Sequence, residues 1–165
     1  LLNRLTGGWT NSHLFSVYHS SLADPLTYPR FFLHILGHAS YAHYIGNMMM
    51  ILVIGPPLEE KYGSRSLLYA ILITALVAGV VQWSFFPGTA LLGASGIVFM
   101  MIVMSSLAGM RDGYIPITLI LVLVLYLGGE VVSGITQSDN VSQLTHVIGG
   151  LCGAFLGLSM SRSRR

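Results

Sequence analysis

Long apolar runs alternate with short polar segments along most of the chain. Five of these runs approach the roughly 20 residues that cross a bilayer as a helix. Each run predicts one membrane-spanning helix, near residues 42–58, 67–86, 91–109, 114–134 and 144–160.

The segment from Trp9 to Phe32 has a different pattern, with two histidines, one aspartate, two prolines and scattered aromatic residues. This mixture favours a structured loop at the membrane interface over a further span. We therefore predict a single all-α polytopic membrane domain over residues 1–165. Residues 1–41 form its N-terminal segment and outer loop, residues 42–160 its five transmembrane helices, and residues 161–165 its cytoplasmic tail.

Composition supports this prediction. Of 165 residues, 53% are hydrophobic and only 8% are charged, whereas a soluble domain carries about 25% charged residues to keep its surface hydrated. The chain therefore does not fit a soluble enzyme, a disordered tail or a nucleic-acid-binding module.

The distribution of positive charge predicts the orientation in the membrane, because cytoplasmic loops carry an excess of Lys and Arg. If the third span descends to the cytoplasm, six of the eight basic residues lie inside: Lys61, Arg65, Arg111, Arg162, Arg164 and Arg165. The C-terminus is then cytoplasmic, and the Trp9–Phe32 loop lies on the extracellular or periplasmic face of the cell (inner) membrane.

Polar side chains are costly at membrane depth and often mark a functional site. Ser95, within Gly93-Ala94-Ser95-Gly96, opens the third span on the predicted outer side. A serine at a helix start can act as a nucleophile close to backbone N–H groups. The alternative is that these small residues only allow two helices to pack closely.

His146 opens the fifth span and shares a helical face with Gly149, Gly153 and Gly157. Such a glycine stripe permits close approach of a neighbouring helix. If that neighbour carries Ser95, the imidazole and the hydroxyl can meet as general base and nucleophile. A lone histidine at a helix start is, however, more often satisfied by a backbone carbonyl.

His43 and Asn47 are four residues apart and therefore share a helical face. Their N–H groups are suitable donors to an oxyanion, or else they form interhelical hydrogen bonds. His34 and His38 repeat the same spacing just upstream, and we interpret both as structural. No aspartate lies within a predicted span, so the predicted catalytic unit is a dyad of Ser95 and His146.

The ordered combination of these motifs resembles the rhomboid family of intramembrane serine proteases. The matching sequences are His34-x3-His38-x4-His43-x3-Asn47, Gly93-Ala94-Ser95-Gly96 and His146-x2-Gly149-x3-Gly153, and Glu60-Lys61-Tyr62-Gly63-Ser64 is similar to a cytoplasmic turn of that family. The similarity extends from about Pro29 to Gly157.

The resemblance implies a six-helix core and cleavage of single-pass membrane proteins at or near the membrane. It assigns Ser95 as nucleophile, His146 as general base, and His43 and Asn47 with the Ser95 N–H as the oxyanion hole. Residues expected to support the site are Gly93, Gly96, Phe99, His38 and Gly149. The resemblance implies neither a cofactor nor a metal, and it makes the helix near residues 114–134, with the loop after it, the gate for substrate entry.

Three departures from the family pattern accompany this resemblance. Five spans are visible instead of six, and we expect that the chain starts at the end of the family's first helix through truncation or cleavage. Phe99 stands where these proteases often carry a tyrosine, and Pro29-Arg30 stands where many bacterial members have Trp-Arg.

Other functions stay open from the sequence. A catalytically silent rhomboid-like protein would bind transmembrane helices without cutting them. A metal or haem site would use His34, His38, His43 and His146, and a transporter would need paired broken helices in two halves of the chain, which the sequence lacks. The expected partners are single-pass membrane substrates and the lipid bilayer, not nucleic acid, and the oligomeric state is left open.

Overall fold

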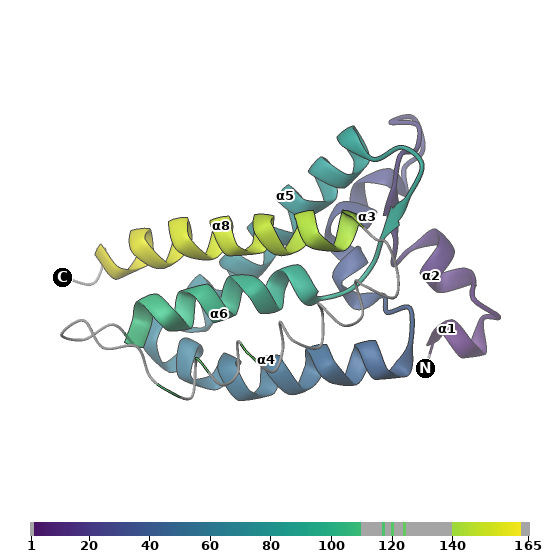
Figure 1. Cartoon of the computed structure of the whole chain (residues 1–165). Coiled ribbons are helices and arrows are strands. Elements are labelled where there is room, and N and C mark those ends of the chain that lie inside the picture. Colours follow the sequence, from purple (N-terminus) through teal and green to yellow (C-terminus); the bar gives the residue numbers. More distant parts are fainter. Residues whose placement is uncertain (1, 110–116, 118–119, 121–123, 125–139, 163–165) are drawn as a thin grey trace.

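The computed structural model describes residues 2–109, 117, 120, 124 and 140–162 of the chain, and most of these residues are helical (Figure 1). The long helices are α4 (Tyr41–Tyr62), α5 (Ser64–Phe85), α6 (Ser95–Gly109) and α8 (Asn140–Arg162). Helix α6 lies between α4 and α8, and all three begin at the end of the molecule where the N-terminal part of the chain is folded.

The helical boundaries agree with the predicted spans in part. Within the described residues, α5 alone combines the length and the apolar character of a membrane span, with a mean hydropathy of 1.9, whereas the apolar helices Ser95–Ala108 and Leu144–Met160 are shorter. The predicted start of the third span at residue 91 is wrong, because that residue belongs to a strand and the helix begins at Ser95. The predicted fourth span, residues 114–134, lies outside the described residues except for positions 117, 120 and 124.

The N-terminal segment (residues 2–40) is more regular than the predicted loop. It contains α1 (Leu2–Leu5), α2 (Trp9–His13), β1 (Val17–Tyr18), α3 (Thr27–Leu33) and the 3-10 helix η1 (His34–Leu36). Strand β1 pairs antiparallel with β2 (Ala90–Leu91), so that Val17 lies opposite Leu91. This short pairing, which the all-α prediction lacks, connects the N-terminal segment to the chain just before Ser95.

The buried side chain of Arg30 contacts several parts of the N-terminal segment. Its Nε donates to the carbonyl O of His13 at 2.7 Å, its Nη1 forms a 2.9 Å ion pair with Asp24, and its guanidinium lies 4.7 Å from the centre of the Tyr18 ring. The hydrogen bond from the backbone N–H of Leu26 lowers the pKa of the Asp24 carboxyl, and the hydrogen bond from Arg30 lowers this pKa further. Arg30 thus connects three separate positions of the N-terminal segment through one buried side chain.

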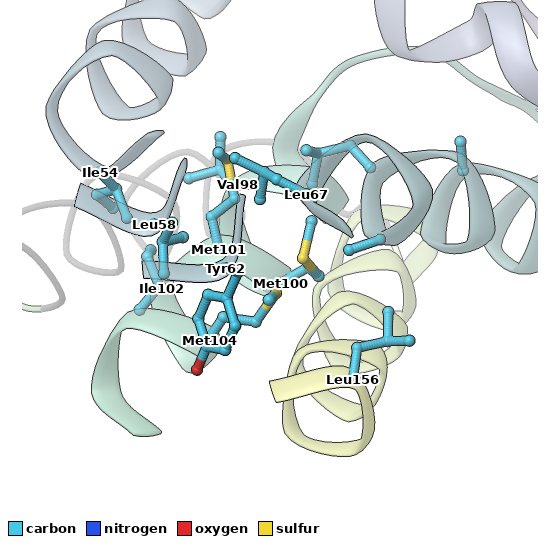
Figure 2. Packing of buried hydrophobic residues seen from close by; sticks show 13 residues of the cluster. Ile54, Leu58, Tyr62, Leu67, Val98, Met100, Met101, Ile102, Met104 and Leu156 are labelled. Atoms are coloured by element: carbon cyan, nitrogen blue, oxygen red, sulfur yellow. The ribbon is translucent and has the colours of Figure 1, made fainter. Parts of the chain in front are cut away.

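The main core lies around α6. Residues 100–102 and Met104 of this helix are at most 2% exposed, and Figure 2 shows them facing side chains of α4, α5 and α8. The labelled members are Ile54, Leu58, Tyr62, Leu67, Val98, Met100, Met101, Ile102, Met104 and Leu156. Methionine is flexible and fills irregular gaps, so this central helix can contact neighbours on several sides at once.

Helices α6 and α8 pack closely because glycines line α8. A Cβ on Gly153 would collide with the carbonyl O of Met100, and one on Gly157 would lie 3.0 Å from Leu107 Cδ1. Small residues of this kind let two backbones approach each other. The sequence left open which helix the glycine stripe faces, and the structure shows that it is the helix of Ser95.

Candidate active site

Ser95 is the first residue of α6 and follows a sharp turn, residues 93–94, which we call the serine turn. Gly93 has a φ of +131°, which L side chains rarely adopt. Its N–H donates to the carbonyl O of His34 at 2.9 Å and so fixes the turn on η1. The first turn of a helix presents N–H groups that have no partner within the helix. Ser95 therefore stands next to donors that can stabilise negative charge developing on a bound group.

The imidazole of His43 lies directly against the serine turn. A Cβ on Gly93 would lie 2.8 Å from His43 Cε1 and 3.1 Å from His43 Nε2, so glycine makes this approach possible. The first turn of α4 carries His43, and the N-cap Ser40 fixes that turn by accepting the His43 N–H at 3.1 Å. Asn47 lies one turn further along the same face of α4 and is buried.

The imidazole of His146 is held on α6 by an aromatic stack. Its ring lies 4.2 Å from that of Phe99, centre to centre, with 14° between the planes. Phe99 follows Ser95 by four residues, so the two side chains share one face of α6. The stack therefore places the imidazole on the face that begins with the serine.

Close packing of α8 on α6 continues at the level of Ser95. A Cβ on Gly149 would collide with the carbonyl O of Gly96, and a Cβ on Gly96 would lie 2.9 Å from Thr145 Cγ2. The helical turn that contains the predicted base thus packs on the residue that follows the predicted nucleophile. The sequence analysis does not single out Thr145, because its importance depends on its contact with Gly96 of the neighbouring helix.

The two upstream histidines are placed differently. His38 packs edge-on against His43, with ring centres 5.2 Å apart, and its Nδ1 lies 3.3 Å from the carbonyl O of Leu36. His34 is fully buried, and its Nε2 lies 3.0 Å from the carbonyl O of Ala75 in α5. The structural interpretation of these two histidines stays a prediction.

The arrangement is suited to acyl transfer. It combines a hydroxyl at a helix start, an imidazole on the same face of that helix, and a second imidazole against the serine turn. The buried Asn47 amide follows one helical turn after that second imidazole. In the part of the chain that the structure describes, no three residues of the types His, Cys, Asp and Glu are grouped to hold a metal ion.

The model of the rhomboid domain family matches residues 25–163, well over half of the chain, and this range includes every residue placed at the site above. The chain belongs to the rhomboid family. The prediction of rhomboid membership and of a helical membrane bundle is thereby confirmed.

A curated relative agrees with this assignment. Rhomboid protease GlpG of Pectobacterium atrosepticum is similar to this rhomboid chain, with 34% identity over 131 residues. The alignment covers 76% of the chain and 47% of the relative. The chain thus spans about half the length of this relative.

Proposed function

We propose that this rhomboid protein is an intramembrane serine endopeptidase with a dyad of Ser95 and His146. The observation that carries the proposal is the stack of His146 on Phe99, because it holds the imidazole on the face of α6 that begins with Ser95. The enzyme would hydrolyse peptide bonds in or near the transmembrane segments of single-pass membrane proteins. Its site would face the extracellular or periplasmic side of the cell membrane, with the C-terminus in the cytoplasm.

In this mechanism Ser95 Oγ attacks the carbonyl carbon of the scissile peptide while His146 accepts the hydroxyl proton. The negative charge that develops on the carbonyl oxygen is stabilised by His43, Asn47 and the Ser95 N–H. His146 then protonates the leaving amine, and an acyl-enzyme ester remains on Ser95. A water molecule, deprotonated by His146, hydrolyses the ester and restores the serine.

The contacts around His43 support its role as an oxyanion donor. Its ring rests on Gly93, two residues before the nucleophile, and α4 begins at an N-cap that fixes the backbone of His43. A donor that is already in place needs no reorganisation when the charge develops. Loss of one such donor costs on the order of 10²–10³ in rate.

Active-site labelling tests the proposal directly. A fluorophosphonate probe reacts covalently with an activated serine, and we expect wild-type protein to be labelled in detergent. Ser95→Ala and His146→Ala should abolish labelling. Ser106→Ala is the matched control, because Ser106 lies on the same helix but its hydroxyl donates to the carbonyl O of Ile102.

A cleavage assay decides between protease and silent helix-binding protein. Wild-type protein is reconstituted into liposomes with a single-pass reporter protein, and the products are followed by mass spectrometry. Cleavage that disappears in Ser95→Ala supports the protease. A folded wild-type protein that binds the reporter but neither cleaves it nor reacts with the probe would overturn the proposal in favour of the silent alternative.

A further inference from the structure

The N-terminal segment makes a specific contact with the residues that lead into α4. Asn11, in α2, donates from its side-chain Nδ2 to the carbonyl O of His38 at 3.0 Å. At the same place Gly37 packs on the backbone of Phe15, where a Cβ would collide with the carbonyl O. Asn11 is thus bonded to a residue 27 positions away that stands just before the helix of the proposed oxyanion donor.

His38 connects this contact to the site. Its ring packs edge-on against the His43 ring at 5.2 Å and against the Tyr44 ring at 5.3 Å. His43 in turn lies against Gly93 of the serine turn. A continuous series of contacts therefore leads from Asn11 through His38 and His43 to the residues that precede Ser95.

We propose that Asn11 is a positioning residue for the oxyanion donor His43, acting through His38. The amide of Asn11 fixes the main chain at His38, and the edge-on ring contact then sets the position of the His43 imidazole. This inference rests on the proposed function, since it gives His43 a role in the reaction. Asn11 lies outside residues 25–163, which the rhomboid domain model matches, so its role is a property of this chain's N-terminal segment.

The local geometry distinguishes positioning from general support. Asn11 also receives structural contacts through its backbone, because its N–H donates to Asn3 Oδ1 at 3.1 Å and its carbonyl O accepts from Ser16 Oγ. Substituting the side chain leaves both backbone contacts in place and removes the bond to His38. Such a variant therefore perturbs the link to His43 while α2 keeps its place.

The test compares Asn11→Ala and Asn11→Asp with the control Ser12→Ala. Aspartate keeps the size of the side chain but presents a carboxylate to the His38 carbonyl, and Ser12 is an exposed neighbour that donates to the carbonyl O of Gly8. With a single-pass reporter, we expect kcat to fall about tenfold in both Asn11 variants, with KM unchanged. Ser12→Ala should match wild type.

A double-mutant cycle with His43→Ala separates positioning from destabilisation. If Asn11 acts through His43, Asn11→Ala should change kcat less than about twofold once the imidazole is absent. The same tenfold loss in both backgrounds would overturn the inference, as would wild-type kcat in Asn11→Asp.

Hydrogen exchange provides a readout that does not depend on activity. We expect Asn11→Asp, but not Ser12→Ala, to speed exchange of the His43 and Tyr44 amides, which bond to Ser40 at the start of α4. Unchanged exchange would refute the coupling even in an inactive protein. Conversely, faster exchange with no labelling of wild-type Ser95 would support the coupling and refute the proposed protease.

Discussion

Replacing Gly93 with alanine tests the contact between the serine turn and His43. The added Cβ would lie 2.8 Å from His43 Cε1, and ordinary contact begins at 3.4 Å, so the imidazole or the turn must move by about 0.6 Å. A shift of about 1 Å in a positioned group can cost about 10²-fold in rate, and complete loss of an oxyanion donor costs about 10²–10³. We therefore expect kcat to fall roughly 15- to 100-fold.

The same substitution should also lower stability. At a φ of +131°, an L residue carries backbone strain of about 1–3 kcal/mol. Gly88→Ala is the matched control, because Gly88 lies in the same connection between α5 and α6 and a Cβ there would meet nothing within 4 Å. Thermal unfolding in detergent measures the stability of both variants, and reporter turnover per labelled serine measures their activity.

The cause of the rate loss can be separated from backbone strain. In a His43→Ala background the imidazole is absent, so Gly93→Ala should lower stability without lowering kcat further. The reasoning is refuted if folded Gly93→Ala turns over the reporter as fast as Gly88→Ala.

Further expectations follow from the stack, the glycine contact and the N-terminal segment. Phe99→Leu should lower kcat about 2- to 12-fold, because the stack on His146 is worth about 0.5–1.5 kcal/mol beyond its buried area, whereas Phe99→Tyr should keep wild-type turnover. Gly149→Ala should lower the thermal unfolding temperature because its Cβ meets backbone, whereas Gly150→Ala, with only one distant contact, should not. The lowered pKa of Asp24 stabilises the folded protein above about pH 4, and this contribution is lost as the pH falls through the folded-state pKa. The stability difference between wild type and Asp24→Asn should therefore shrink in acid. Serine labelling should be unchanged after treatment with a metal chelator.

Each of these expectations has a contrary result. Equal kcat in Phe99→Leu and wild type would show that the stack does not set the position of the base. Equal unfolding temperatures for the two glycine variants would contradict the close packing of α8 on α6. A stability difference that is constant from pH 7 to pH 3 would contradict the Asp24 interaction, and loss of labelling with a chelator would favour the metal site.

Much of the fold could be predicted because it depends on local patterns. A run of apolar residues predicts a helix by its length and composition alone, and the glycine spacing of α8 identified the face that packs on α6. The start of α6 was predicted too early, because residues 91–94 are apolar or small like the helix that follows. In the structure, Leu91 pairs with Val17 of β1, and the positive φ of Gly93 interrupts the chain after it. The helix therefore starts at Ser95, and neither feature can be read from the local sequence.

The candidate site was predictable to a different degree. Ser95, His146, His43 and Asn47 can be found as polar residues at the starts of apolar spans and from the order of their motifs, and their roles stay predictions. Asn11 carried no signal, since an asparagine in a polar segment is ordinary and its partner is 27 residues away.

The sequence by itself determined the class of the protein, its apolar helices, its rhomboid motifs and the residue types available for chemistry. These properties depend on which side chains stand a few positions apart on one helix. Tertiary structure alone decided that Phe99 stacks on His146, that His43 rests on Gly93 and that Asn11 bonds to the chain before α4. Such contacts join residues far apart in sequence, and packing among several helices selects them, so no local pattern encodes them.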